Sequence, residues 1–316
     1  MRGTRGGVPA FVTRAGESIA VLAGLASAVF FALRLLPGDP ARLVVGDEAS
    51  PAELERVRAT LHLNEPLLVQ YARFMRGLLR LDLGDSMRRP GVAAMARVTE
   101  ALLPTARLAL LAVAAGAIVG VGAATLASGP WLSARGRTIV DRVLVAAAAT
   151  PLLALAPLVT WVLAARLRVL PLPGDPEAGA SGLAFASGLL AIPLAAHVGR
   201  VARASLVDVG HSQFLVVAGA KGARPARVWF LHALPAVLGP IVTVVGTQLG
   251  ALLGGAVVLE RMFERRGLGT LILEAYATRD LPVLEGAIVA AGGLFVVAQA
   301  ASSAVHLAID PRARGE

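Results

Sequence analysis

Six stretches of about twenty residues in this chain are almost free of charged side chains. A helix of that length crosses the hydrocarbon core of a bilayer, which is about 30 Å thick. A soluble domain carries about a quarter charged residues, whereas only 16% of these 316 residues are charged. Because a single folded core has no room for six such runs, the sequence predicts an all-α membrane protein with six transmembrane helices.

Charged or helix-breaking residues separate the predicted spans, which are 18–36, 108–127, 143–165, 182–199, 236–259 and 286–309. The first span ends at Leu-Pro-Gly-Asp-Pro (36–40), because proline has no N–H with which to continue a helix. Arginines precede this span as they precede the apolar part of a signal peptide. No cleavage pattern follows them, however, so we expect an uncleaved first helix.

The short loops predict the orientation, because Lys and Arg accumulate on the cytoplasmic side of a membrane. The loop between the fourth and fifth spans carries five basic residues and one acid, and both termini carry arginines. We therefore expect both termini in the cytoplasm. The chain then divides into a cytoplasmic N-terminus (1–17), the first span (18–36), an extracytoplasmic helical segment (37–107), a five-helix core (108–309) with a cytoplasmic loop (200–235), and a cytoplasmic C-terminus (310–316).

The extracytoplasmic segment has the sequence of a folded region. Ser50-Pro51-Ala52-Glu53 is a capping box with proline at the first helical position, and it predicts a helix to about Thr60. A second helix follows Pro66 and carries an apolar stripe. We expect this stripe to pack against the membrane helices; it consists of Leu67, Leu68, Tyr71, Phe74, Met75, Leu78 and Leu79.

Glycines at intervals of four residues mark helix faces that allow close packing in membranes. They are Gly116 and Gly120 on the second span, and Gly246, Gly250 and Gly254 on the fifth. The sequence is compatible with packing inside the chain and with a contact to a partner subunit.

Several kinds of chemistry are missing from the sequence. There is no cysteine, no GxxxxGK[ST] phosphate-binding loop, and no motif of a hydrolase or metalloprotease, so we predict no catalytic residue and no metal site. The net charge of +9 does not indicate nucleic acid, because the arginines lie between apolar runs. Few ionisable or strongly coordinating groups, such as His197 and Gln248, lie in the middle of the spans, which is little for a proton- or sodium-coupled transporter.

The basic loop between the fourth and fifth spans contains a short apolar segment. Residues 214–220 suit a short helix, and Gly222 suits the left-handed position that ends one. A small apolar helix on this side of the membrane either docks into a partner or lies on the membrane surface.

This loop resembles the EAA-x3-G-x9-I-x-L-P signature of the inner-membrane components of binding-protein-dependent ABC importers. Val216-Val217-Ala218 stands at EAA, Gly222 at the glycine, and His232-Ala233-Leu234-Pro235 at the final element. Val216 and His232 depart from the general signature as the dipeptide/oligopeptide branch does. Segments 36–40, 61–86, 255–269, 277–286 and 310–312 are also similar to that branch, with Gly219, Arg266, Ser302 and Ser303 as departures.

The resemblance implies the type I ABC importer permease fold and a place in the cytoplasmic membrane of a bacterium. It implies that the loop is a coupling helix in a groove of an ATPase subunit, with Phe214, Val217, Ala218, Ala220, Lys221, Gly222, Arg224, His232 and Pro235 as its residues. Small side chains would allow close seating, and the two basic residues would pair with acids of the ATPase.

The same resemblance implies a transport subunit that is not itself an enzyme. Its partners would be a second homologous permease, one or two ATPase subunits that hold ATP and Mg²⁺, and an extracytoplasmic peptide-binding protein. The expected substrates are di- and oligopeptides. A nickel or other small-solute importer is the alternative, and a stand-alone secondary transporter or a membrane scaffold is a weaker one. Thr243, Thr247 and Gln248 either line the transport path or make helix–helix hydrogen bonds.

Overall fold

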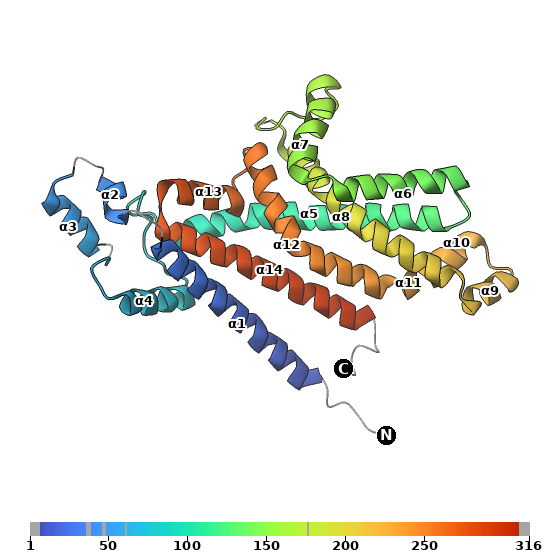
Figure 1. Ribbon diagram of the computed structural model, residues 1–316, viewed down its shortest axis with the longest axis horizontal. Coiled ribbons are helices and arrows are strands. Elements are labelled where there is room, and N and C mark those ends of the chain that lie inside the picture. Colours follow the sequence, from blue (N-terminus) through green and yellow to red (C-terminus); the bar gives the residue numbers. More distant parts are fainter. Residues whose placement is uncertain (1–6, 36–38, 46–48, 61, 176, 310–316) are drawn as a thin grey trace. The chain divides into compact units, whose positions relative to one another are not determined.

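The computed structural model describes residues 7–35, 39–45, 49–60, 62–175 and 177–309, and this part of the chain is almost entirely helical (Figure 1). Residues 36–38 of the motif at 36–40, and the whole motif at 310–312, therefore lie outside the described residues. The chain divides into two compact units. The first unit comprises residues 1–105 and 266–296, and the second comprises 106–265 and 297–316.

The first unit contains one predicted span and the short helices of the extracytoplasmic segment. Its helices are α1 (Gly7–Arg34), α2 (Pro40–Val45), α3 (Pro51–Thr60), α4 (Leu67–Arg80), α13 (Leu268–Thr278) and the first parts of α5 (Ala94–Ser128) and α14 (Leu281–Ile309). Helix α1 runs antiparallel to α14, because Leu25 lies against Gly292 while Arg34 pairs with Glu285. The C-terminal end of α1 and the N-terminal end of α14 therefore lie at the same face of the membrane.

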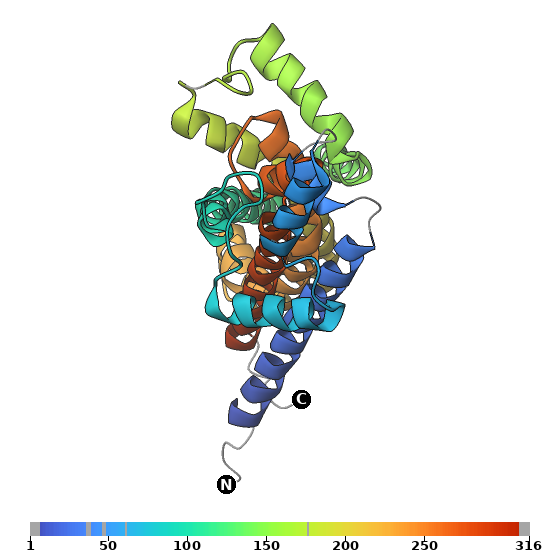
Figure 2. The ribbon, with the colours of Figure 1, turned by 90° about the vertical axis from the view of Figure 1, so that its left-hand side faces the viewer.

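Helix α4 lies across α1, as Figure 2 shows. The predicted apolar stripe of α4 divides into two sets. Tyr71, Phe74, Met75 and Leu78 pack in a cluster with Phe30 of α1, which confirms the prediction for these four residues. The prediction is wrong for Leu67, Leu68 and Leu79, which are exposed because they lie outside the cluster that α4 forms with α1 and α14.

The predicted capping box at the start of α3 is present. The backbone N–H of Ser50 donates to Oε2 of Glu53 at 2.9 Å, and the N–H of Glu53 donates to Oγ of Ser50 at 3.3 Å. The hydrogen bond from the Ser50 backbone lowers the pKa of Glu53, because it stabilises the carboxylate form.

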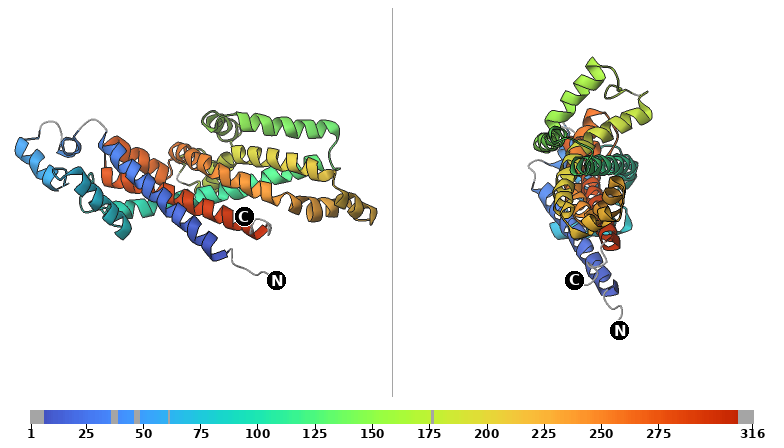
Figure 3. Two further views of the ribbon diagram at one scale, coloured as in Figure 1. Left: turned by 60° about the horizontal axis from the view of Figure 1, so that its bottom comes forward. Right: turned by 90° about the vertical axis from the view of Figure 1, so that its right-hand side faces the viewer.

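The second unit is built around one long helix. It contains α6 (Ala134–Ala149), α7 (Leu152–Thr160), the π-helix η1 (Trp161–Arg166), α8 (Gly179–Gly210), α9 (Gln213–Ala220), α10 (Pro225–Val228), the π-helix η2 (Trp229–Ala233), α11 (Leu234–Ala236), α12 (Leu238–Met262) and the remaining parts of α5 and α14. Helix α8 packs between α6 and α12 (Figure 3). Its side chains form the centre of the largest apolar cluster.

The spaced glycines serve packing inside this unit. A Cβ on Gly120 would lie 2.5 Å from the Ala195 carbonyl oxygen of α8, so only glycine allows this approach. A Cβ on Gly246 would lie 2.8 Å from Oγ of Ser302. Gly254 has open space around it. Intrachain packing therefore explains the glycines that have neighbours.

The third predicted span is not one straight helix. The axes of α6 and of the α7–η1 segment differ by 112° across Thr150 and Pro151. Thr150 is extended, with φ −88° and ψ 121°. Proline disfavours the α conformation in the residue before it and donates no backbone hydrogen bond. These local effects account for a break that an apolar run alone does not reveal.

The other five predicted spans each lie on a continuous helix that is long and apolar enough to cross a membrane. If the bent pair of α6 and α7–η1 counts as one span, the total is six. The helices are longer than the apolar runs. Helix α5, for example, begins at Ala94, whereas the predicted second span begins at residue 108. An apolar run marks the hydrocarbon thickness, while a helix continues until its capping residues end it. The orientation of the termini stays a prediction.

Candidate functional site

The predicted coupling segment forms a short helix, α9, at one end of α8 (Figure 1). Leu215 is only 6% exposed and belongs to the main apolar cluster of the second unit. Phe214, Val216 and Val217 are 49%, 66% and 51% exposed. Helix α9 is therefore anchored by one buried leucine and presents apolar side chains on its surface.

The end of α9 is fixed by backbone geometry. Gly222 has φ +82°, its N–H donates to the Gly219 carbonyl at 2.9 Å, and the N–H of Ala223 donates to the Ala218 carbonyl at 3.3 Å. These two bonds define a Schellman motif with glycine at its left-handed position. The predicted role of Gly222 as the residue that ends the helix is confirmed.

The basic residues of the segment are available for contacts. Lys221 and Arg224 are exposed, and neither has an ion-pair partner among the residues that the structure describes. Ala220 is exposed and Ala218 is half-buried, so small side chains lie beside this positive charge.

His232 and Pro235 lie on a different part of the connection from the end of α9. His232 is in η2, and Pro235 is in the first turn of α11. Both are exposed, while Ala233 between them is fully buried. A π-helical turn just before a proline is consistent with the missing N–H of that proline. The predicted residues of α9 thus lie together, whereas His232 and Pro235 lie on the segment that returns to α12.

The three predicted path residues do not share one environment. Thr243 and Thr247 donate to the carbonyls of Gly239 and Val244 in their own helix, at 3.1 and 2.9 Å. Gln248 lines a cavity of about 360 Å³ between α8, α12 and the start of α7. Of the three, Gln248 lines this cavity.

His197 lines the same cavity as Gln248, together with Thr150 and several apolar side chains. Its Nδ1 lies 2.8 Å from the Pro193 carbonyl, which can only accept, so Nδ1 carries the proton and donates. His197 and Gln248, which the sequence places in two different spans, thus meet at one cavity. The sequence contains both residues, but their meeting depends on the packing of α8 against α12.

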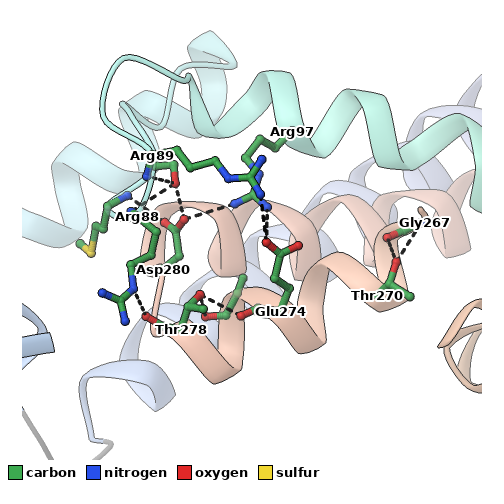
Figure 4. Close-up of polar contacts among 11 residues, drawn as sticks. Arg88, Arg89, Arg97, Gly267, Thr270, Glu274, Thr278 and Asp280 are labelled. Atoms are coloured by element: carbon green, nitrogen blue, oxygen red, sulfur yellow. Dashed lines mark hydrogen bonds and ion pairs between the residues drawn. The ribbon is translucent and has the colours of Figure 1, made fainter. Parts of the chain in front are cut away.

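A polar network in the first unit joins two of the family-like motifs (Figure 4). Asp280 is 0% exposed and accepts hydrogen bonds from the Ser86 hydroxyl and, at 3.0 Å, from the Met87 backbone N–H. Arg97 Nη1 lies 3.4 Å from the same carboxylate, and its Nη2 lies 3.0 Å from Glu274. The loop after Ser86 is thereby tied to the connection between α13 and α14.

Two further contacts complete this network. Arg88 Nε donates to the Thr278 carbonyl at 3.0 Å, and Thr270 caps the start of α13 through the backbone of Gly267 (Figure 4). Motif similarity marks residues 61–86 and 277–286 separately. It does not indicate that Ser86 and Asp280 form a pair.

An ion pair lies where α1 ends and α14 begins. Arg34 pairs with Glu285, whose side chain is only 7% exposed, and the guanidinium carbon of Arg34 lies 3.4 Å from the centre of the Phe30 ring. An ion pair at the end of a span satisfies both charges near the hydrocarbon. Among the described residues, no group of three or more His, Cys, Asp or Glu is arranged to hold a metal ion.

The sequence matches the family described as "Binding-protein-dependent transport system inner membrane component" over residues 116–315. Residues 9–90 match the N-terminal region that accompanies this family. These matches confirm the resemblance that the motifs indicate.

Curated relatives extend over nearly the full length. A probable peptide ABC transporter permease of Sinorhizobium fredii is 32% identical over 308 residues, which are 94% of this chain and 96% of the relative. A dipeptide transport system permease of Alkalihalophilus pseudofirmus is 31% identical, with 93% and 96% covered. A glutathione transport system permease of Pectobacterium atrosepticum is 34% identical, with 90% and 92% covered. This multi-pass chain therefore belongs to the family of inner membrane components of bacterial binding-protein-dependent transport systems.

Proposed function

We propose that this chain is the permease subunit of an ATP-driven importer that moves di- and oligopeptides across the bacterial cytoplasmic membrane. The observation that carries this proposal is α9, which is anchored by Leu215 and exposes Phe214, Val216 and Val217. An apolar surface next to unpaired basic residues is suited to a protein groove with an acidic rim. In the family, the partner with such a groove is an ATPase subunit.

The partner of α9 is a cytoplasmic ATPase subunit, which holds ATP and Mg²⁺; this chain binds no cofactor and is not itself an enzyme. The contact residues are those of α9 with Lys221, Gly222 and Arg224. Since Leu215 is packed in the main cluster, a displacement of α9 is transmitted to the helices of the second unit. ATP-driven closure of the ATPases then switches the path between its inward- and outward-facing states.

A second, homologous permease completes the path, because one six-helix chain does not enclose a route for a peptide. An extracytoplasmic peptide-binding protein docks on the outer loops, which include 38–102 and 260–285. The Asp280 network holds parts of both loops in one arrangement. The cavity at His197 and Gln248 is the candidate for a segment of the path.

Peptides are the proposed substrate class because the relatives are named for peptides, dipeptides and glutathione, which is itself a tripeptide. No observation in the described residues favours nickel over peptide. The identity of the ligand on the cognate binding protein separates these two alternatives directly.

The test is peptide uptake and ATP hydrolysis in proteoliposomes that contain this chain, its second permease, its ATPases and its peptide-binding protein. Val217→Glu and Gly222→Asp should leave the chain in the membrane and reduce peptide-stimulated hydrolysis by about tenfold or more, since each places an unpaired charge in a buried contact. Val207→Glu, at an exposed valine of α8 outside the segment, is the matched control.

Cross-linking from position 217 should capture the ATPase subunit in the working complex. Uptake and hydrolysis at the level of the unmodified protein in both α9 variants would overturn the docking assignment. Loss of activity in the control as well would show that charge anywhere on this surface disturbs the chain.

A further inference from the structure

The first unit contains a cavity of about 550 Å³, bordered mainly by the outer loops, for which the proposed transport function names no ligand. This volume is within the range of small-molecule sites, about 300–1,000 Å³. The cavity is bounded by one side of α4, the loop after it, and the first turn of α14. Its charged lining consists of Arg34, Arg73, Arg76, Arg80, Asp82, Asp85 and Glu285, with His62 at one edge.

Three of these charges already have partners. Arg34 pairs with Glu285, and Arg73 Nη2 lies 2.6 Å from Glu65. Arg76 and Arg80, in contrast, form no ion pair with any described residue, and neither do Asp82 and Asp85. The cavity thus presents two unpaired guanidinium groups and two unpaired carboxylates.

Each of the two carboxylates also keeps an oxygen for a ligand. Asp82 accepts one hydrogen bond from the Gly84 N–H at 3.0 Å through Oδ1, and Asp85 accepts one from the Gly91 N–H at 3.1 Å through Oδ2. The second oxygen of each carboxylate accepts no hydrogen bond from the residues that the structure describes. A ligand with one negative and one positive group matches this balance of two cations and two anions better than a plain anion does.

The position of the cavity relative to the bilayer follows from the helices that border it. Arg34 is the last residue of α1, and Glu285 is in the first turn of α14. Both helices are long and apolar enough to span a membrane. Since they run antiparallel, their ends at Arg34 and Glu285 place the cavity at the level where the hydrocarbon gives way to the headgroups.

Helix α4 has the properties of a helix that lies in the membrane surface. It crosses α1 (Figure 2), its polar side carries the three arginines of the cavity, and Leu68 and Leu79 are 73% and 84% exposed. Leu81, which follows the helix, is also exposed. An amphipathic helix with basic residues on its polar side and exposed leucines beside them lies at the headgroup boundary.

We propose that this cavity binds the zwitterionic headgroup of a phosphoethanolamine phospholipid. Arg76 and Arg80 bind its phosphate, and Asp82 and Asp85 accept hydrogen bonds from its ammonium group. The exposed leucines of α4 contact the acyl chains of the same lipid. The inference is independent of the peptide proposal, because it requires only that the chain spans a membrane.

The test uses the full purified chain in detergent and native mass spectrometry, with phosphatidylethanolamine, phosphatidylcholine or phosphatidylglycerol added separately. Phosphatidylcholine has the same phosphate but no N–H on its ammonium group. It cannot donate hydrogen bonds to Asp82 and Asp85, so it should bind about tenfold more weakly than phosphatidylethanolamine. Phosphatidylglycerol should also bind more weakly, because it leaves the two carboxylates without a cation. An equal affinity for all three lipids would overturn the proposal.

The variants separate the two halves of the headgroup. Arg76→Gln with Arg80→Gln should reduce binding of all three lipids about tenfold. Asp82→Asn with Asp85→Asn should abolish only the preference for phosphatidylethanolamine, since asparagine still accepts the loop hydrogen bonds. Arg42→Gln, at an exposed arginine of α2 outside the cavity, should change nothing. Since all four lining residues are exposed, thermal melting should not change.

Soluble ligands distinguish a lipid from other zwitterions. Glycerophosphoethanolamine and a dipeptide each carry matching charges but lack acyl chains. Displacement of the lipid by either one at similar concentrations would show that the exposed leucines contribute nothing and would overturn the lipid assignment. If each soluble ligand displaces the lipid only at a large excess, the result supports the lipid assignment. Weaker lipid binding after Leu79→Ser would support it too.

Discussion

Asp280 and Gly222 show how single residues control local structure in each of the two units. Asp280 has no exposed surface, and its carboxylate contacts a hydroxyl, a backbone N–H and a guanidinium. A buried charge of this kind is stable only while those partners remain. Gly222 has open space around its Cα, so its importance comes from its φ of +82° and not from crowding.

We expect Asp280→Asn to destabilise the first unit by about 3–5 kcal/mol, because it leaves Arg97 without its buried partner charge. Thermal unfolding gives the loss of stability, and tryptic cleavage after Arg88 reports release of the loop. Glu274→Gln is the matched control, since Glu274 also contacts Arg97 but its side chain is 50% exposed. Its effect should stay below about 1 kcal/mol. Equal effects of the two changes would contradict a special role for the buried carboxylate.

Gly222→Ala should strain the end of α9 by about 1–2 kcal/mol, because a residue with a Cβ is unfavourable in the left-handed conformation. Gly219→Ala is the control: Gly219 has equally open space but lies in the helix, where alanine is favourable. In the reconstituted importer, peptide-stimulated ATP hydrolysis should fall about fivefold or more for position 222 only. A larger loss at position 219 would indicate that close seating of α9, and not its end, limits coupling.

At the scale of elements, prolines decide where apolar segments stay continuous. Pro104 and Pro193 lie inside α5 and α8, which run through them. Pro151 instead follows an extended Thr150 and coincides with the 112° bend between α6 and α7. The bend places the start of α7 beside α8 and α12, where Thr150 joins His197 and Gln248 at one cavity.

Pro151→Ala should allow a straighter arrangement of α6 and α7. With a rise of 1.5 Å per residue, backbone positions 139 and 162 would separate from about 20 Å in the bend to about 35 Å in a straight helix. Spin labels at these positions, measured by electron–electron double resonance, should show a new longer distance. Pro157→Ala, inside α7, should leave the distribution unchanged. An unchanged distribution in Pro151→Ala would mean that packing against α8 and α12 alone holds the bend.

At the scale of the whole molecule, the two units carry different tasks. The second unit contains α9 and the cavity at His197 and Gln248, which are the candidates for coupling and transport. The first unit contains the Asp280 network and the cavity beside α4. The outer segment and the coupling loop are predicted to lie on opposite sides of the membrane.

This orientation can be tested directly, because the chain has no cysteine to give background labelling. Ala52→Cys and Lys221→Cys place single thiols at exposed positions of α3 and of the turn after α9. A membrane-impermeant maleimide should label position 52 in intact cells and position 221 only in inverted vesicles, because the basic loop is expected in the cytoplasm. The reverse pattern would place both termini outside and remove α9 from the reach of an ATPase.

The amino-acid sequence by itself determined the apolar segments, the capping box at Ser50 and the glycine that ends α9. Each of these depends on interactions between residues a few positions apart, or on the match between one apolar run and the bilayer. The spacing of the coupling signature is equally local, and it was sufficient to indicate the family.

Only the tertiary structure decided which of these local features meet. Ser86 and Asp280 are 194 residues apart, and Arg34 and Glu285 are 251 residues apart. Whether Leu79 is buried or exposed depends on which side of α4 packs against α1, and whether Gln248 lines a cavity depends on the bend at Pro151. Such contacts follow from the path of several helices at once, so no pattern within a single segment specifies them.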